Sequence, residues 1–447
     1  MDRDSVEPQV TELPGDRAET LVEYHHDHAA PTTYVCEFVW DHTEPAIGPF
    51  CTDVDGNVLL DFTGHVGASP LGYNNPKILD PLSAFDLVDP LKIAGQDFYL
   101  PAQGAPGSDA DIPGPADLMD RLSDISSQYD MDTVFLSNSG AEAVENALKI
   151  AFDHTHGKYT ITTEGAFHGR TLGVLSLNRS KGKYRKQFPE IPAVEDMPYC
   201  TDRSCTQETC DCGFFFDDTS TLRQMLDPDT GYVDPDGVAG LVLEPFQGEG
   251  GYRPPSEAFM DEIADLCATY DVPLIADEIQ SGVGRTGEWW ASDHYAVEPD
   301  VIASAKALRV GATISREEVF PDERGRLSST WGAGDIIAAA QGVFTLDAIE
   351  EYDLLDSATE RGRQMIELLE DADLPGAVDV RGKGLMLAVE FDAADRRDAI
   401  QEQAFANGFL TIGCGERTLR LLPPLDVTER EIELGARLLS DAAHTVD

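Results

Sequence analysis

Basic residues are scarce in this 447-residue chain, and lysine is the least common of the four charged types. The sequence contains 32 lysine and arginine residues against 82 aspartate and glutamate residues, for a formal net charge of −50. Only nine of the basic residues are lysines, whereas 23 are arginines. Because nucleic acids attract basic surfaces and repel acidic ones, this balance disfavours a nucleic-acid partner.

Long hydrophobic runs are also missing. No run approaches the roughly 18 apolar residues that a transmembrane helix needs, so we expect no membrane partner. The N-terminal segment MDRDSVEPQVTELPGD is acidic and lacks the apolar core of a secretory signal. The overall composition, 42% hydrophobic and 26% charged, is typical of a globular protein. These features predict a cytoplasmic protein.

The acidic residues are spread along the whole chain instead of forming a tail, which predicts an acidic surface over the entire fold. Such a surface repels itself at low ionic strength, and concentrated salt screens the repulsion. The charge therefore favours a halophilic enzyme that works in multimolar salt. A nucleic-acid mimic or a divalent-cation store is disfavoured, because dispersed acids form no particular site.

Four of the eight cysteines fall in one segment, as Cys200, Cys205, Cys210 and Cys212. Zinc sites are typically built from paired Cys-x-x-Cys motifs, and the spacing here, with four, four and one intervening residues, is irregular. A reducing cytoplasm also disfavours disulfides. The spacing favours free loop thiols and no metal, with a metal site and a disulfide as the alternatives.

Strand patterns alternate with helical patterns through the middle of the chain. Strands are predicted at 133–137, 159–163, 238–243, 272–276 and 301–304, with helices at 140–152 and near 256–270. This alternation indicates βα units, and so an α/β fold with a mainly parallel sheet. The remaining patterns predict a smaller α+β domain. The expected division is an acidic arm at 1–33, a first part of the small domain at 34–75, a large domain at 76–345 and a C-terminal small domain at 346–447.

Two polar segments directly follow predicted strands, where open α/β sheets bind their ligands. Asp277 and Glu278 follow one apolar strand, and a carboxylate there suits a protonated pyridine nitrogen. The alternative is a solvated loop or a capping pair. Lys306 follows the next strand and is the only lysine in a long stretch of the chain. An apolar setting can lower the pKa of such a lysine, which favours a Schiff-base nucleophile.

Two further segments have the chemistry of a binding site. Ser139-Gly140-Ala141 lies where a predicted strand runs into a helix, and backbone N–H groups there suit a phosphate. The alternative is a simple helix cap. In Phe167-His168-Gly169-Arg170, an aromatic ring can stack on a flat cofactor and an arginine can bind a carboxylate. The alternatives are a core phenylalanine and a surface arginine.

Together these segments resemble the class III aminotransferases, which include 4-aminobutyrate, ornithine, acetylornithine and lysine 6-aminotransferases. The resemblance runs from about residue 35 to about residue 440. It rests on six motifs in order: SNSGAEAVENALKIA, GAFHGRTLG, EPFQGEGGY, LIADEIQSGVGRTGEWWA, PDVIASAKAL and LRLLPPL. It implies the pyridoxal-phosphate-dependent transferase fold type I, a transaminase activity, pyridoxal 5′-phosphate (PLP) as cofactor, and a homodimer.

The resemblance also assigns cofactor-binding roles. Lys306 matches the lysine that holds PLP as a Schiff base and shuttles a proton. Asp277 matches the carboxylate on the pyridine nitrogen, and Gln280 the partner of the phenolic oxygen. The other matched cofactor residues are Ser139, Gly140 and Ala141 at the phosphate, Phe167 on the ring, His168, and Thr330, which would reach the phosphate from the other subunit.

For substrates, the resemblance matches Arg170 and Arg420 to carboxylate-binding arginines and Glu249 to a switchable partner of Arg420. Val66 occupies a position where ornithine-type enzymes usually carry tyrosine and 4-aminobutyrate enzymes carry an aliphatic residue, which favours 4-aminobutyrate as donor. The resemblance implies 2-oxoglutarate as the acceptor. The alternatives are a lysine 6-aminotransferase, an ornithine or acetylornithine type, and, less favoured, an amino-acid racemase of the same fold. The segment 308–311 lacks the family's glycine-rich stretch, so that loop has no predicted structure.

We expect activity and stability to fall when salt is reduced to about 0.01 M, where the Debye length approaches 30 Å and acidic side chains repel one another over long distances. Thermal unfolding and turnover measured across a salt series check this expectation. A protein that is fully stable and active at about 0.01 M salt would contradict the halophilic interpretation.

Overall fold

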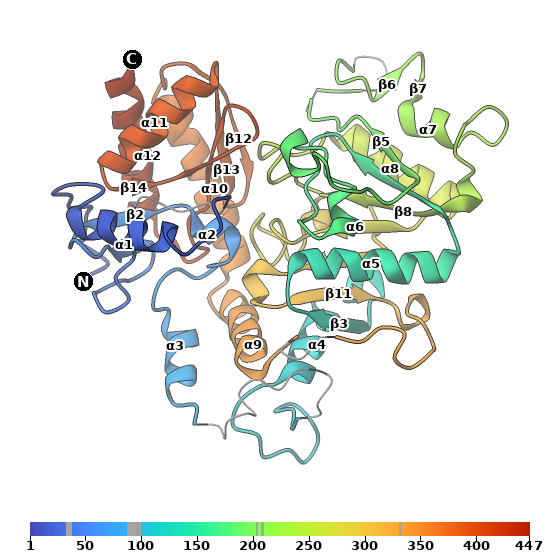
Figure 1. Ribbon diagram of the computed structural model, residues 1–447, viewed down its shortest axis with the longest axis horizontal. Helices are drawn as coiled ribbons and strands as arrows, with labels where there is room; N and C mark the ends of the chain where they lie inside the picture. Colours follow the sequence, from blue (N-terminus) through green and yellow to red (C-terminus); the bar gives the residue numbers. More distant parts are fainter. Residues whose placement is uncertain (33–37, 87–95, 97–99, 203, 207–209, 330–332) are drawn as a thin grey trace. The chain divides into compact units, whose positions relative to one another are not determined.

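The computed structural model describes residues 1–447 except 33–37, 87–95, 97–99, 203, 207–209 and 330–332 (Figure 1). The chain divides into two compact units. The larger unit comprises Asp80–Glu351, and the smaller unit combines Met1–Leu79 with Tyr352–Asp447. The predicted boundaries at residues 76 and 346 differ from these by a few residues.

The larger unit is built on a seven-stranded sheet with the order β3-β11-β10-β9-β8-β4-β5. Neighbouring strands are parallel except at β11, which runs antiparallel to both β10 and β3. This arrangement confirms the predicted α/β class. The strands are β3 (Thr133–Ser137), β4 (Tyr159–Thr163), β5 (Val194–Met197), β8 (Val238–Leu243), β9 (Leu274–Asp277), β10 (Val301–Ser304) and β11 (Gly311–Ser315).

Strand β11 was not predicted, because the sequence around residues 308–311 departs from the family pattern. The strand begins at Gly311, which lies directly opposite Ser137 of β3. A side chain at Gly311 would overlap the Ser137 hydroxyl and the Ser139 carbonyl. The absence of a side chain therefore lets β11 lie close to the start of the helix that follows β3.

Helix α5 (Gly140–Thr155) follows β3 and packs against β8, β10 and β11. Its buried face includes Val144, Leu148 and Ala151, the apolar face that the sequence predicted. Burial of a valine or leucine side chain typically contributes about 1.5–3 kcal/mol to the free energy of folding. The other helices of this unit are α4 (Pro115–Asp124), α6 (Leu172–Leu175), α7 (Thr221–Leu226), α8 (Glu257–Tyr270) and α9 (Ile336–Glu351), and α3 (Pro76–Ser83) spans the boundary between the units.

The smaller unit contains an antiparallel sheet and a second, three-stranded sheet. The first has the order β12 (Ala377–Lys383), β13 (Met386–Phe391), β16 (Thr418–Leu421) and β15 (Ile412–Cys414), and the second joins β1 (Phe50–Thr52), β2 (Val58–Asp61) and β14 (Phe409–Leu410). Its helices are α1 (Asp16–His26), α2 (Gly64–Gly67), α10 (Leu354–Asp371), α11 (Ala394–Ala406) and α12 (Glu429–Val446). The unit has an α+β organisation.

The N-terminal segment, predicted as an acidic arm at residues 1–33, contacts the C-terminal part of the smaller unit. Arg3 forms ion pairs of 2.8 Å with Glu431 and 3.0 Å with Asp426. Glu431 is a fully buried carboxylate of α12, and a buried charge needs a partner. The segment therefore supplies that partner.

Among the described helices, none has the length and apolar content needed to cross a membrane.

Candidate active site

Asp277 and Lys306 lie at the carboxyl ends of two neighbouring parallel strands. Asp277 is the last residue of β9 and pairs in register with Ala303 of β10. Lys306 follows β10 and begins a short 3₁₀ turn. Its φ of +29° falls in the left-handed region, which is costly for a residue with a side chain. Such strain occurs at functional sites and also in turns, so the role of Lys306 stays a prediction.

A buried histidine holds the Asp277 carboxylate. Oδ2 of Asp277 lies 2.7 Å from Nδ1 of His168, and the two side chains are 4% and 0% exposed. Oδ1 of Asp277 accepts the N–H of Ile279 at 3.2 Å. The backbone N–H of His168 donates to Asn178 Oδ1 at 2.7 Å. His168 therefore contacts the carboxylate, and Asn178, which the sequence did not identify, fixes the backbone of His168.

Close approaches at three glycines bring the predicted segments together. A Cβ atom on any of these glycines would meet a neighbouring segment at less than normal contact distance. The approaches are Gly140 to Ile279 at 2.7 Å, Gly169 to Ala141 at 2.7 Å and Gly248 to Gln280 at 2.9 Å, each measured from the position of an ideal Cβ. The start of α5 therefore lies against the loops after β4 and β9, and the loop after β8 lies against the loop after β9.

The start of α5 offers backbone N–H groups to an anion. Ser139 is the N-cap, and its Oγ accepts the N–H of Glu142 at 3.2 Å. Glu142 accepts the N–H of Asn138 at 2.6 Å. The N–H groups of Gly140 and Ala141 are in the first turn, where no intrahelical acceptor exists. These two donors at the positive end of a 16-residue helix suit a phosphate group.

Arg170 lies over two aromatic rings. Its guanidinium is 5.5 Å from the Phe167 ring centroid and 4.6 Å from that of Tyr184. The two rings meet edge to face at 5.5 Å. Arg170 is exposed, and no carboxylate in the described parts of the chain forms an ion pair with it. Arg170 is thus available to a carboxylate from outside the protein.

Glu249 is held by two residues that the sequence analysis did not identify. Its Oε1 atom accepts Lys181 Nζ at 2.7 Å and the Tyr184 hydroxyl at 3.0 Å. Burial, and then the charge of Glu249, raises the pKa of Tyr184, so this hydroxyl keeps its proton. Arg420, its predicted partner, is a residue of β16 in the smaller unit and is 5% exposed.

Glu244 was also missed by the sequence analysis. It directly follows β8, and its carboxylate accepts the N–H groups of Phe167 and Gly248, both at 2.8 Å. Burial raises the pKa of Glu244 to about 7. The available signal was the same as for Asp277, a carboxylate directly after a buried strand. Glu244 ties the loop that carries Phe167 to the loop after β8.

Glu278 has a different environment from Asp277, although the two are adjacent in sequence. Its Oε1 atom accepts the Ser292 N–H at 2.8 Å and the Ser292 hydroxyl at 2.9 Å, and Oε2 accepts the Ser281 hydroxyl at 2.6 Å. The side chain is fully buried, and burial raises its pKa to about 7. Glu278 is therefore a structural carboxyl group.

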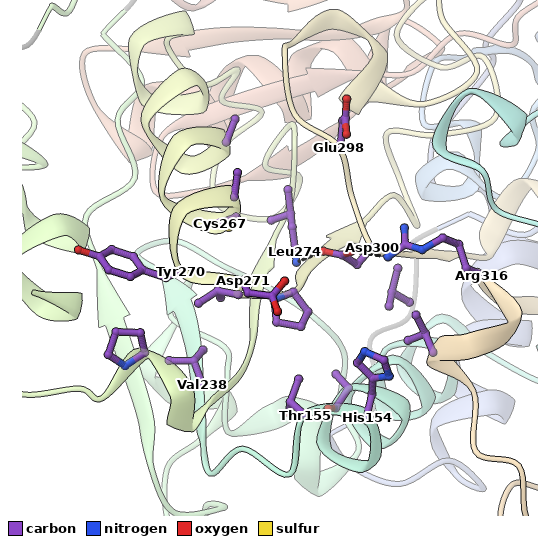
Figure 2. Close-up of a pocket in the computed structure, with 18 of the residues that line it drawn as sticks. His154, Thr155, Val238, Cys267, Tyr270, Asp271, Leu274, Glu298, Asp300 and Arg316 are labelled. Atoms are coloured by element: carbon purple, nitrogen blue, oxygen red, sulfur yellow. Dashed lines mark hydrogen bonds and ion pairs between the residues drawn. The ribbon is translucent and has the colours of Figure 1, made fainter. Parts of the chain in front are cut away.

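A pocket of about 680 Å³ lies at the amino ends of central strands of the sheet, opposite the ends that carry Asp277 and Lys306 (Figure 2). It is lined by Val238, Leu274 and Val301, the residues at which β8, β9 and β10 begin. Figure 2 shows Asp300 and Arg316 at its wall, joined by a 2.7 Å ion pair. Because parallel sheets bind ligands at the carboxyl ends of their strands, this pocket is separate from the candidate active site.

Thr330, predicted to bind the phosphate, lies outside the described residues.

Comparisons with known proteins identify relatives over most of the chain. The family model described as Aminotransferase class-III matches residues 38–443. Acetylornithine aminotransferase of Archaeoglobus fulgidus is 32% identical, over 88% of this chain and 92% of the relative. Putrescine aminotransferase of Pectobacterium atrosepticum is 32% identical, over 87% and 79%. Lysine aminotransferase from M. tuberculosis, solved in its internal aldimine form, superposes with a TM-score of 0.81 at 27% identity, covering 96% of this chain and all of that one.

The buried Glu278 predicts a pH-dependent stability. Its pKa is about 7 in the folded protein and near the ordinary 4.5 when unfolded. The folded state therefore retains a proton that the unfolded state loses, and this contribution to stability is lost as the pH rises through that window. Relative to Glu278→Gln, the wild type should lose about 2 kcal/mol of unfolding free energy between pH 5 and pH 8.

Urea unfolding of both proteins at constant high salt measures this difference. The exposed Glu323→Gln provides a matched control, for which we expect no pH-dependent difference from the wild type. A constant difference between wild type and Glu278→Gln across the pH range would show that the carboxyl group does not titrate as described.

Proposed function

Since the chain belongs to the class III aminotransferases and is a PLP-dependent transaminase, we propose that it moves an ω-amino group from 4-aminobutyrate to 2-oxoglutarate. The observation that carries this proposal is the exposed Arg170 guanidinium over Phe167 and Tyr184, with no carboxylate partner in the described parts of the chain. A planar guanidinium binds a carboxylate through two parallel hydrogen bonds. Arg170 would thus hold the carboxylate of the donor, with the ω-amine directed to the reacting centre.

The residues around Asp277 fit the cofactor. When bound, PLP supplies an electron sink that stabilises negative charge beside the carbon that carries the amino group. The buried, histidine-held carboxylate of Asp277 is a suitable partner for a protonated pyridine nitrogen. The N–H groups at the start of α5 suit the phosphate, and Phe167 offers the face of a ring.

Each remaining predicted residue then has a task that its chemistry allows. Lys306 Nζ would hold the cofactor covalently, and then accept a proton from the substrate carbon and return it. Gln280 would donate its amide to the cofactor's phenolic oxygen. His168 acts through Asp277 and is a positioning residue, because its Nδ1 atom contacts that carboxylate.

The side chain of Val66, in the smaller unit, supports the choice of donor. Val66, in α2, has a φ of +60°, which is rare for a β-branched side chain. By resemblance, an aliphatic side chain at this position favours 4-aminobutyrate over ornithine. Lysine, with transfer of its 6-amino group, is the alternative donor, and the similarity to lysine aminotransferase over 96% of this chain favours it.

We further propose that Glu249 adapts the site to two unlike substrates. 4-Aminobutyrate has one carboxylate and 2-oxoglutarate has two, so Arg420 would need a substrate partner only in the second half-reaction. Glu249 would neutralise Arg420 in the first half-reaction and release it in the second, because an unpaired buried guanidinium is costly. Lys181 and Tyr184 would then compensate the released Glu249, since both already donate to its Oε1 atom.

The assembly and setting expected from the sequence complete the proposal. We propose a cytoplasmic homodimer in which Thr330 of one subunit binds the cofactor phosphate of the other. A dimer that must associate while each chain carries a charge of −50 needs screening by salt.

Replacement of Lys306 tests the proposed activity. Lys306→Ala should lose nearly all transamination of 4-aminobutyrate, on the order of 1,000-fold or more, because both the covalent link and the proton carrier are removed. Turnover is measured in high salt with 4-aminobutyrate, lysine, ornithine, acetylornithine and putrescine, each with 2-oxoglutarate. Lys158→Ala is the control and should retain wild-type activity.

Two outcomes of that experiment would contradict the proposal in different ways. Wild-type rates in Lys306→Ala would end the catalytic assignment. A donor panel in which lysine exceeds 4-aminobutyrate in kcat/KM would keep the reaction and replace the donor.

Half-reaction kinetics test the switch. Arg420→Ala should lower kcat/KM for 2-oxoglutarate by about 100-fold and affect 4-aminobutyrate far less. Lys181→Met should lower kcat/KM for 2-oxoglutarate about threefold, because the partly exposed pair with Glu249 is weak and its loss favours the pairing of Glu249 with Arg420. The exposed Lys186→Met is the matched control. Equal losses in both half-reactions would identify a permanent structural pair instead.

A further inference from the structure

Four cysteines of the larger unit form one cluster. The Sγ atoms of Cys200, Cys205, Cys210 and Cys212 all lie within 4.8 Å of one another. Cys200 and Cys205 are buried, and Cys210 and Cys212 are partly buried. The sequence favoured free loop thiols, with a metal site as one alternative, and the convergence of the four sulfur atoms supports that alternative.

The fold explains how this spacing forms a cluster. Cys200 lies shortly after β5, and its backbone carbonyl accepts the N–H of Ser256, the N-cap of α8, at 2.9 Å. Cys210 and Cys212 lie just before a hairpin formed by β6 (Phe215–Phe216) and β7 (Thr219–Ser220). Figure 1 shows this hairpin and α7 beside β5 and α8. The segment between β5 and this hairpin thus brings together four sulfur atoms from positions that are separated in sequence.

The hydrophobic core anchors both ends of the segment. Cys200, Cys205, Phe214 and Phe215 belong to the buried cluster that also includes Phe259 of α8. The rings of Phe214 and Phe259 are 4.6 Å apart. The thiols are therefore held by packing on both sides, as the ligands of a preformed site must be.

The distances suit a tetrahedral zinc site. Zinc binds thiolate sulfur at about 2.3 Å, so two sulfurs at neighbouring corners of a tetrahedron lie roughly 3.8 Å apart. Cys200 Sγ and Cys210 Sγ are 3.8 Å apart. Cys210 Sγ and Cys212 Sγ are 2.6 Å apart, so a bound ion requires these two side chains to separate by about 1 Å.

A disulfide accounts for the cluster less well. A bond between Cys210 and Cys212 would leave Cys200 and Cys205 as an unexplained buried pair of thiols. In a reducing compartment, four converging thiols are typical of a metal site.

Metal binding to such a cluster is linked to the loss of protons. A thiolate is the form that binds a metal, so the four thiols would release their protons when the ion binds.

We propose that Cys200, Cys205, Cys210 and Cys212 bind one structural Zn²⁺ ion. Four thiolates complete the tetrahedron and leave no open position for a substrate, so the site stabilises the fold and takes no part in transamination. The ion would fix the segment between β5 and the hairpin to the start of α8. Tyr199, next to Cys200, donates its hydroxyl to the carbonyl of Glu244 at 3.0 Å, so the fixed segment also supports the loop after β8.

Metal analysis of the purified holoenzyme tests the proposal without reference to activity. Protein prepared in high salt without added metal should contain about one zinc ion per chain, measured by inductively coupled plasma mass spectrometry. Titration of the wild type with a mercurial reagent should release the zinc as the cluster thiols react. Because this titration uses the intact protein, it gives an answer even if a cysteine variant fails to fold.

Variants assign the ligands. Cys200→Ser and Cys212→Ser should each lose the zinc and lower Tm by about 5 °C or more, while their bound PLP keeps its absorption. Cys267→Ser, a partly buried cysteine of α8 outside the cluster, is the matched control and should keep both zinc and Tm.

Four results would overturn the proposal. The first is wild-type protein free of divalent metal with every thiol open to titration. The second is a mass lower by two hydrogens with a Cys210–Cys212 disulfide in the peptide map. The third is iron in place of zinc, and the fourth is zinc that remains bound in both serine variants.

Discussion

The buried contact between Asp277 and His168 is the interaction on which the rest of the site depends. A carboxylate that is 4% exposed must be compensated, and the 2.7 Å contact to His168 does this on one side. The same contact fixes the loop after β4, which places Phe167 and Arg170 beside Tyr184. On the other side, the register of β9 with β10 sets Asp277 against Ala303, so that Lys306 emerges from the next strand at the same edge. Two segments far apart in sequence thus acquire a fixed relation through one buried polar pair.

Carboxylates serve several distinct purposes in this acidic chain, and their surroundings decide which. Most of the 82 acidic residues contribute to the charge of the surface. Glu244 and Glu278 are buried and accept hydrogen bonds from backbone N–H groups or serine hydroxyls, and burial raises the pKa of each to about 7. Glu249 instead meets a cation, Lys181, within the larger unit. Lysine is scarce in this chain, and a glutamate fully exposed to water would not need a cation as partner.

Much of the larger unit was predictable because its signals are local. The strands at 133–137, 159–163, 238–243 and 301–304 have the predicted bounds, since a short apolar run directly after a helix or turn identifies a buried parallel strand. Strand β11 was not predictable in this way, because its position depends on space left by Gly311 against β3. The cysteine cluster and the contacts of Glu249 likewise depend on tertiary structure. In both, the fold brings together residues whose spacing in the sequence has no recognisable period. Asn178 and Glu244 support the site through the backbone, and such roles leave little trace in a single sequence.

We propose that Asp277, His168 and the start of α5 hold PLP and that Lys306 alone bonds to it. Borohydride reduction of the holoenzyme in high salt, followed by peptide mapping with mass spectrometry, identifies the bonded lysine, because reduction makes the link between lysine and cofactor permanent. We expect a single phosphopyridoxyl group on the peptide that contains Lys306. A label on another lysine, such as Lys149 or Lys181, with an unmodified Lys306 peptide, would contradict it.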